Sequence, residues 1–264
     1  MIGVIVAAGV VGVLGIIIGV FLGVAGKKLA VEVDEREVAI TGVLPGNNCG
    51  GCGYAGCAGL AAAIAKGEAP VNQCPVGGST VANQISAIMG VEAAEGKHMV
   101  AYVMCAANHE QTNSDYAYTG IQDCAAMQYV PNGGPRSCNY GCLGYGSCVK
   151  ACSFDAIHIV EGTARVDKDA CKACGKCIAA CPKNLIELIP YDAKYVVRCA
   201  SKNMGKVVID ACGAGCISCH LCEKNCEADA IKVIDNIARI DYDKCTQCGT
   251  CAEKCPKKVI KVER

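Results

Sequence analysis

The chain is poor in the large aromatic residues that usually fill a protein core. Its 264 residues include no Trp and two Phe, and aromatic residues make up 5% of the total. Small modules without such a core need another source of stability, which a bound metal can supply. The four histidines are isolated, and we find no phosphate loop, flavin fingerprint or acid–base constellation. We therefore expect no catalytic residue on this chain.

An excess of either charge is also absent. The chain has 25 basic and 25 acidic residues, with no basic tract and no acidic tail. Proteins that bind nucleic acid usually carry a basic patch or tail. The sequence therefore predicts no nucleic-acid partner.

Cysteine is abundant, with 24 residues, and the cellular compartment decides whether such thiols form disulfides or bind metal. Residues 1–26 carry no charge, and Lys27 and Lys28 follow directly. A helix of this length crosses a bilayer core of about 30 Å, and the two lysines favour a cytoplasmic C-terminal side. We predict a single-pass transmembrane anchor over residues 1–28 in the cytoplasmic (inner) membrane, with reduced thiols on the cytoplasmic side. A buried helix or an uncleaved secretion signal is the alternative.

Sixteen cysteines form two copies of one pattern, offset by a constant 74 positions. A constant offset indicates that the thiols of each copy jointly hold something of fixed geometry. Short apolar alternations predict small β-hairpins, with short helices after the cysteine loops. The predicted fold class is α+β, with a transmembrane helix, a small helical 4Fe-4S module and two tandem bacterial-type 2[4Fe-4S] ferredoxin domains. The boundaries are anchor 1–28, cluster module 29–90, connector 91–137, and ferredoxin-like domains 138–198 and 199–264.

The spacing of the repeated cysteines predicts individual clusters. A Cys-x2-Cys-x2-Cys run supplies three ligands of a [4Fe-4S] cluster, and in two-cluster ferredoxins the fourth ligand comes from the other run. Zinc usually takes thiols as separated pairs, so we favour iron–sulfur clusters over zinc. Three ligand sets follow: Cys216, Cys219, Cys222 with Cys255; Cys245, Cys248, Cys251 with Cys226; and Cys171, Cys174, Cys177 with Cys152.

One site is irregular, because Tyr145 stands where the second copy has a cysteine. Cys142, Cys148 and Cys181 then supply three thiolates, and we predict that Cys138 supplies the fourth. A [3Fe-4S] cluster without a fourth ligand is the alternative. Four cysteines have no assignment, and we interpret them as buried thiols, with a further cluster or a redox pair as the other interpretation: Cys105, Cys124, Cys199 and Cys212.

The N-terminal module contains a further cysteine pattern. Its spacing is Cys-x2-Cys-x4-Cys-x16-Cys-Pro, which again gives three close ligands and one distant ligand. The glycines between them allow the backbone to curl around a cluster. They also satisfy G-x-G-x-x-G, but a turn precedes them where a dinucleotide site needs a strand. About five clusters are predicted in all, and this one has the ligands Cys49, Cys52, Cys57 and Cys74.

The order of these features is specific. An apolar N-terminal helix, then Val43-Leu44-Pro45-Gly46-Asn47-Asn48-Cys49-Gly50-Gly51-Cys52-Gly53-Tyr54-Ala55-Gly56-Cys57, then tandem ferredoxin motifs, resembles the B subunits of the Rnf complexes over essentially the whole chain. Tyr145 departs from the family's pattern.

The resemblance implies a subunit of a membrane-bound, ion-translocating ferredoxin:NAD⁺ oxidoreductase, a translocase, with no substrate-converting site on this chain alone. It would receive electrons from reduced soluble ferredoxin and pass them to membrane subunits and an NAD-binding subunit, coupled to Na⁺ or H⁺ translocation. The alternatives are a polyferredoxin subunit of another membrane complex, such as a hydrogenase, and a non-redox role as an iron–sulfur carrier or a zinc-stabilised scaffold.

Overall fold

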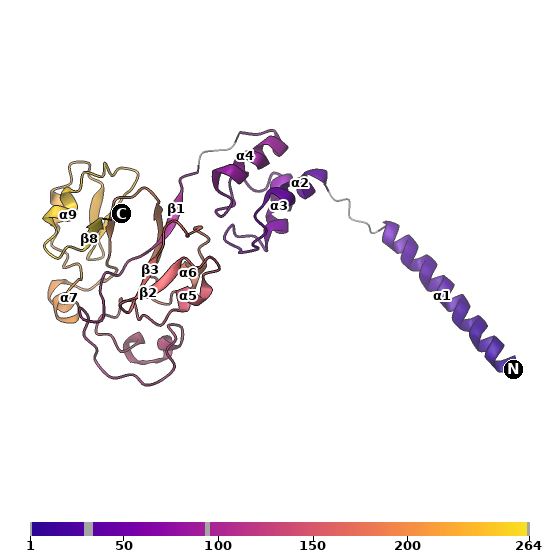
Figure 1. Ribbon diagram of the computed structural model, residues 1–264, viewed down its shortest axis with the longest axis horizontal. Coiled ribbons are helices and arrows are strands. Elements are labelled where there is room, and N and C mark those ends of the chain that lie inside the picture. The colour runs from indigo at the N-terminus through magenta and orange to yellow at the C-terminus, as the bar shows by residue number, and fades with distance from the viewer. Residues whose placement is uncertain (1, 29–33, 93–95, 263–264) are drawn as a thin grey trace.

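The computed structural model describes residues 2–28, 34–92 and 96–262. Three parts follow one another along the chain: an N-terminal helix, a group of three helices, and a body that contains all the strands described. Figure 1 shows the first helix extending away from the rest, with the helical group between it and the body.

The first helix, α1, covers Ile2–Lys28, which is the segment predicted as a membrane anchor. Taken over the side chains that the structure describes, no helix is both long and apolar enough to cross a bilayer. The anchor stays a prediction from the sequence.

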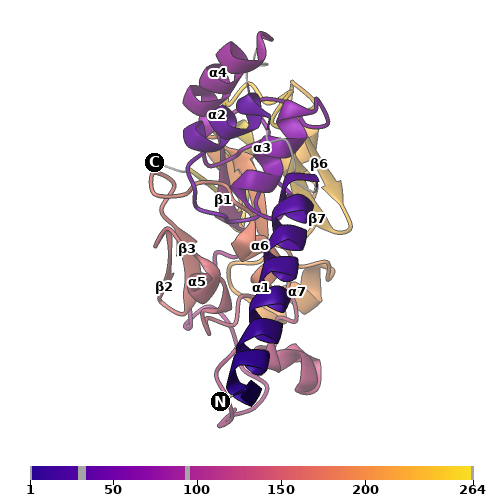
Figure 2. The ribbon, with the colours of Figure 1, turned by 90° about the vertical axis from the view of Figure 1, so that its right-hand side faces the viewer.

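Helices α2 (Glu35–Val43), α3 (Cys57–Ala65) and α4 (Gly78–Met89) form the second part, and Figure 2 shows them grouped together. Ile40, Leu60 and Ile85 are almost fully buried where the three helices meet. The small alanines of α3 leave room for close helix packing. The helices are short, so this shared apolar core, rather than intrinsic propensity, stabilises them.

The first half of the body contains two antiparallel strand pairs, two short α-helices and two 3-10 helices. Strand β1 pairs with β4, so that Val100 lies opposite Ile189, and β2 pairs with β3 as a hairpin. The elements are β1 (Met99–Val103), η1 (Ala126–Tyr129), η2 (Pro131–Gly133), α5 (Ser147–Ala151), β2 (Ile157–Val160), β3 (Thr163–Val166), α6 (Lys176–Ala180) and β4 (Ile186–Pro190).

The second half repeats this plan. Strand β5 pairs antiparallel with β8, and β6 pairs with β7. The elements are β5 (Tyr195–Val197), α7 (Gly205–Ala211), α8 (Leu221–Lys224), β6 (Ile231–Ile234), β7 (Ile237–Ile240), α9 (Thr250–Lys254) and β8 (Ile260–Val262). We refer to the halves, from β1 to β4 and from β5 to β8, as the first and second units.

The two units begin earlier than the boundaries predicted from the sequence. Strand β1 lies inside the predicted connector 91–137, and β5 lies inside the predicted domain 138–198. Each of these strands is the first of its unit and pairs with the last. The 74-residue offset cannot show this pairing, because the first unit carries a long excursion, residues 104–137, between β1 and the repeated cysteines.

The cores of both units combine aliphatic residues with cysteine. Ile157, Leu185 and Ile186 are buried in the first core together with several thiols, and Ile231 and Val259 are buried in the second. Since the strands have three to five residues each, the side chains of the cysteine loops make up a large part of each core.

Candidate iron–sulfur centres

The three Cys-x2-Cys-x2-Cys loops share one backbone shape. Each has a left-handed residue on either side of its middle cysteine, which turns the three thiols toward one side. Consecutive amides in such a turn also form a concave surface that suits an anion. The φ values are 51° at Ala173 and 77° at Gly175, 55° at Ser218 and 57° at His220, and 57° at Gln247 and 85° at Gly249.

The outlying cysteine of each set also has a constant environment. The amide of the residue four positions later donates a hydrogen bond to its Sγ. The residue three positions after the cysteine is left-handed, with φ of 49–51°. Ser153 and Glu227 stand where proline is usual after such a cysteine, and this geometry is the same at all four positions. The N···Sγ distances are 3.4 Å for Ala156 and Cys152, 3.4 Å for Leu185 and Cys181, 3.3 Å for Ala230 and Cys226, and 3.4 Å for Val259 and Cys255.

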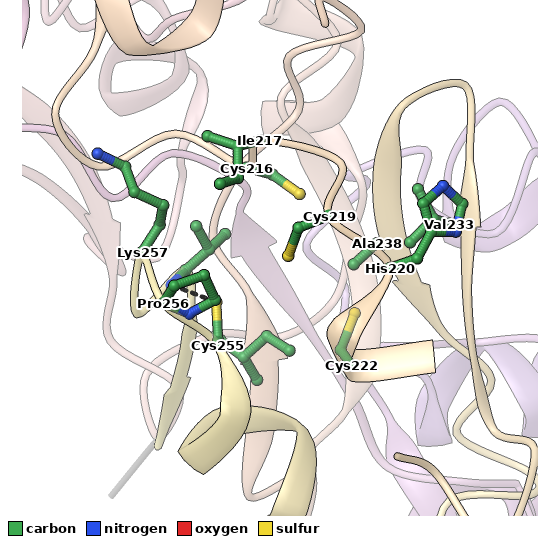
Figure 3. Close-up of a pocket in the computed structure, with 12 residues that line it drawn as sticks. Cys216, Ile217, Cys219, His220, Cys222, Val233, Ala238, Cys255, Pro256 and Lys257 are labelled. Carbon is green, nitrogen blue, oxygen red and sulfur yellow. Dashed lines mark hydrogen bonds between the residues drawn. The ribbon is translucent and has the colours of Figure 1, made fainter. Parts of the chain in front are cut away.

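The Cys216 site (Cys216, Cys219, Cys222 and Cys255) shows the predicted grouping directly. The four residues line one pocket, and Figure 3 shows their sulfur atoms pointing into the same space. Burial raises the pKa of Cys222 to about 11, and the three neighbouring thiols add to this shift. All four ligands predicted from the spacing therefore lie around one volume.

Two further predicted sets are brought together in the same way. At the Cys171 site, burial raises the pKa of Cys177 to about 11, with contributions from its three predicted partners. At the Cys245 site, burial raises the pKa of Cys251 to about 11, again with its three predicted partners nearby. The sets are Cys171, Cys174, Cys177 and Cys152, and Cys245, Cys248, Cys251 and Cys226.

At the irregular site, the structure places Cys124 beside three of the predicted thiols and Cys138 elsewhere. Cys142, Cys148 and Cys181 line one pocket together with Cys124, and Cys138 lines another pocket. Burial raises the pKa of Cys148 to about 12, and Cys142, Cys124 and Cys181 all contribute. We call this group the Cys142 site. Cys124 is therefore the fourth thiol at this pocket.

Local contacts hold Cys124 at the Cys142 site. Its amide donates to Ser147 Oγ at 3.1 Å, and that hydroxyl donates to Asp123 Oδ2 at 3.3 Å. The Tyr145 loop meanwhile keeps the shape of the three-cysteine loops, with φ of 78° at Gly144 and 77° at Gly146. The loop has lost its middle thiol but not its fold. The spacing of the repeat gave no sign of Cys124, because this residue comes from the excursion.

The N-terminal set lies at the start of α3. The Cys57 amide donates to Asn48 Oδ1 at 2.8 Å, and Gln73 Nε2 donates to the Cys52 carbonyl at 3.1 Å. Burial raises the pKa of Cys74, and the thiols of Cys52 and Cys57 add to this shift. Cys49 begins the same loop and is half-buried. We call these four cysteines the Cys49 site.

The loop of the Cys49 site touches the loop of the Cys171 site. A β-carbon added to Gly51 would lie 2.6 Å from the carbonyl oxygen of Cys174 and 2.9 Å from its Cα. Such contacts are shorter than packed atoms allow, so only glycine fits at this position. The N-terminal module and the first unit therefore meet at two cysteine loops.

The spacing between the thiols suits a cluster. Across residues 2–28, 34–92 and 96–262, no three His, Cys, Asp or Glu side chains converge closely enough to hold one metal ion. The cysteines instead line shared pockets, with four thiols around each. A tetrahedral zinc site needs four ligands within about 2.3 Å of one point, whereas a [4Fe-4S] cluster occupies a volume between its four thiolates. The residues present fit the cluster.

Histidine does not join these groups in the Cys216 loop. His220 Nδ1 lies 2.8 Å from Glu223 Oε2 in an exposed pair, and Figure 3 shows its ring beside the thiols rather than between them. Its polar contact is therefore with a carboxylate at the surface.

Comparison with protein families supports the iron–sulfur assignment. Residues 44–76 match the family described as a putative Fe-S cluster, and residues 163–186 and 238–261 each match a 4Fe-4S binding domain. These matches cover the N-terminal module and part of each unit. The prediction of ferredoxin-type domains is confirmed.

Similar curated proteins extend over nearly the whole chain. The B subunit of the Na(+)-translocating ferredoxin:NAD(+) oxidoreductase complex of Acetobacterium woodii is 43% identical over 258 residues, covering 97% of this chain and 77% of that protein. The B subunit of the ion-translocating oxidoreductase complex of Methanosarcina acetivorans is 42% identical over 250 residues, covering 94% of each chain. The B subunit of the proton-translocating ferredoxin:NAD(+) oxidoreductase complex of Clostridium ljungdahlii is 41% identical over 253 residues, covering 94% of this chain and 89% of that protein. Taken with the grouped thiols, these similarities confirm the predicted resemblance: the chain belongs to the family of B subunits of the ion-translocating oxidoreductase (Rnf) complexes.

Proposed function

We propose that this chain relays electrons from reduced ferredoxin toward NAD⁺ reduction, within a complex that couples the transfer to Na⁺ or H⁺ translocation. Family membership makes it an iron–sulfur electron-transfer subunit of such an oxidoreductase. The observation that carries the proposal is the convergence of four thiols around one cavity at the Cys216 site. A [4Fe-4S] cluster there would supply one-electron chemistry.

Five sites form the proposed relay. Thiolate ligation fixes each cluster, and hydrogen bonds to sulfur help to set its reduction potential. The amides that donate to Cys152, Cys181, Cys226 and Cys255 have this role. The five sites are the Cys49, Cys171, Cys142, Cys216 and Cys245 sites, with Cys124 as the fourth ligand of the Cys142 site.

Contacts between sites suggest how electrons pass along the chain. Gly51 abuts Cys174, which places the Cys49 and Cys171 sites beside one another. Cys177 contributes to the raised pKa of Cys148, so the Cys171 and Cys142 sites are neighbours within the first unit. These contacts form a continuous path from the N-terminal module into the first unit.

The second unit is the proposed electron-accepting end. Cys219 and Cys248 are exposed, whereas the other predicted ligands are buried or half-buried. Clusters at the Cys216 and Cys245 sites would therefore approach the surface most closely. Electron exchange with soluble ferredoxin requires such an approach, and we place ferredoxin docking at this surface.

The anchor and the partners complete the proposal. Residues 1–28 would cross the inner membrane once and hold the cluster-bearing parts on its cytoplasmic side, close to the membrane subunits and the NAD-binding subunit. The uncharged run and the lysines that follow it support this orientation. Because residues 1–26 contain no ionisable side chain, we expect the ion path to lie in other subunits.

Reduction by ferredoxin tests the proposed function. The full chain, purified without oxygen, is mixed with reduced ferredoxin, and the loss of iron–sulfur absorbance is followed; membrane subunits, the NAD-binding subunit and NAD⁺ are then added. We expect the absorbance to fall and then to recover as NADH appears. A chain that ferredoxin cannot reduce, or one that is colourless and carries zinc, contradicts the proposal. Reduction by hydrogen with a hydrogenase, but not by ferredoxin, would favour the polyferredoxin alternative.

A further inference from the structure

Four cysteines remain outside the five sites, and the structure gathers all four around one cavity. Their side chains line one pocket, as the cysteines of the Cys142 and Cys216 sites line pockets of their own. We call this group the Cys105 site, and its members are Cys105, Cys138, Cys199 and Cys212.

The four thiols are buried and lie near one another. Three of them are buried outright, and Cys138 is half-buried. Burial raises the pKa of Cys138, and Cys212 and Cys105 add to this shift. Burial likewise raises the pKa of Cys199 to about 12, with a contribution from Cys138. Each thiol is thus linked to another member of the group.

The Cys105 site is built symmetrically from the two units. Cys105 lies two residues after β1, and Cys199 lies two residues after β5. Cys138 and Cys212 occupy equivalent positions in the 74-residue repeat. The two segments that carry the first pair meet where the Ala106 amide donates to the Arg198 carbonyl at 2.9 Å. Each unit therefore contributes one matched pair of thiols to a cavity at their junction.

Backbone donors face this group as they do the other sites. The amides of Ser201 and Cys216 donate to Cys199 Sγ at 3.5 Å and 3.3 Å. The second of these joins the Cys105 site to the Cys216 site through a single residue. Amide donors directed at sulfur stabilise a thiolate ligand.

A buried arginine independently indicates negative charge at this position. Arg136 is 6% exposed, and although its Nη2 donates to the Gly162 carbonyl at 2.9 Å, its Nη1 is buried without a hydrogen-bond partner. None of the ion pairs formed by the described residues includes it. Its charge acts on the thiols of both Cys212 and Cys142. A buried cation needs a counter-charge, and thiolate-bound clusters on either side would supply it.

We propose that Cys105, Cys138, Cys199 and Cys212 bind a sixth iron–sulfur cluster, of the [4Fe-4S] class, at the junction of the two units. With this sixth cluster, each of the 24 cysteines belongs to a four-thiolate site. The four thiols lose their protons when they bind iron. The cluster lies between the Cys216 site, reached through the Cys199–Cys216 contact, and the Cys142 site, reached through Arg136. It carries electrons from the second unit to the first.

Cluster counting tests this proposal on the native chain. Protein purified anaerobically after synthesis in an iron–sulfur-competent host is measured by native mass spectrometry and by iron and sulfide analysis. Six clusters, or about 24 irons, are expected, against about 20 for five clusters. Five clusters with these four cysteines recovered as free thiols, as a disulfide or as a zinc site overturn the proposal.

Variants locate the extra cluster. Cys105→Ser/Cys212→Ser should lose about four irons while the signals of the other sites stay. Asn203→Ala alters the wall of the same pocket without removing a thiol, and this variant should keep the full iron content and all the cluster signals. If the double variant does not fold, Cys138→Ser changes the least buried ligand, and its EPR spectrum after full reduction should have one altered centre. A Cys138→Ser spectrum and iron content identical to those of the unmodified chain contradict the proposal.

The test of the sixth cluster is independent of the test of the proposed function, because clusters are counted without ferredoxin. Six clusters in a chain that ferredoxin cannot reduce would support the sixth cluster and contradict ferredoxin as the electron donor. Five clusters in a chain that ferredoxin reduces would support the electron donor and contradict the sixth cluster.

Discussion

Individual backbone conformations prepare the thiols of this chain for a cluster. Non-glycine residues with positive φ are uncommon and cost energy, yet Ala173, Ser218 and Gln247 all adopt it at equivalent positions. The Tyr145 loop keeps the same turns through Gly144 and Gly146. Ligand identity and loop shape are therefore separable: a loop can keep its shape and lose a thiol when another segment supplies one.

Changing Cys124 tests this separation. Cys124→Ser should convert the Cys142 site to a three-iron centre, which gives an EPR signal in the oxidised protein, because three thiolates remain. Tyr145→Cys in the same background should restore a four-iron centre, since its loop already has the required turns. The measurement is EPR with iron analysis on the anaerobically purified chain. An unchanged spectrum in Cys124→Ser would show that another residue is the fourth ligand.

Changing Gly51 tests the contact between the N-terminal module and the first unit. Gly51→Ala places a β-carbon 2.6 Å from a backbone oxygen of Cys174, so the two loops must separate. We expect unchanged iron content and at least a severalfold slower electron transfer between the module and the first unit, measured by rapid-mixing kinetics. The matched control is Gly42→Ala, where a β-carbon meets no atom within 4 Å. Equal rates in the two variants would show that this contact does not govern transfer.

The secondary-structure elements are short and depend on one another. In the two units, strands of three to five residues and α-helices of four to seven are not stable alone. Each unit is closed by pairing its first strand with its last, and the excursion of residues 104–137 is tied to the hairpin of the first unit. Thr163 on β3 is fully buried, and its hydroxyl donates to the carbonyl of Ala107.

Removing that hydroxyl should loosen the excursion. Thr163→Val keeps the shape of the side chain but leaves the Ala107 carbonyl unpaired, which should cost about 1–3 kcal/mol. Thr163→Ser keeps the hydroxyl and should cost less. Urea unfolding of the cluster-loaded chain, followed by circular dichroism, measures both. Equal losses in the two variants would assign the effect to packing rather than to the hydrogen bond.

At the scale of the whole molecule, the thiols are both ligands and core. Several predicted ligands are buried in the two cores. The first core contains Cys142, Cys148, Cys171 and Cys177, and the second contains Cys222. A protein without Trp and with two Phe buries little else that is large. Clusters that bind only the folded chain therefore contribute their binding free energy to its folding.

Removal of iron should unfold the two units. Chelation under reducing conditions should abolish the cooperative unfolding transition and the hydrogen-exchange protection of β6 and β7, because the second core keeps few apolar side chains. The group formed by α2, α3 and α4 has its own aliphatic core and should lose less. Hydrogen exchange followed by mass spectrometry measures each region separately. Full protection of β6 and β7 without iron would show that the aliphatic core is sufficient.

The regular spacing of the cysteines was enough to predict most of the site. Three four-cysteine sets and the Cys49 module follow from local sequence patterns, because three ligands of each cluster come from one short loop. Cys124 could not be found this way, since it enters the Cys142 site from an excursion with no counterpart in the second unit. The prediction of Cys138 at this site rests on nearness in the sequence, which is not the same as nearness in space.

The sequence alone determined the family, the iron–sulfur chemistry and the repeated loops, since these depend on contacts between residues close together in the chain. Only the tertiary structure decided which distant segments meet. Pairing of β1 with β4 and of β5 with β8 sets the limits of the units and carries Cys105 and Cys199 to their junction. The remaining thiols, Cys138 and Cys212, line the same cavity. Long-range strand pairing is governed by packing of the whole core, and no local pattern encodes it.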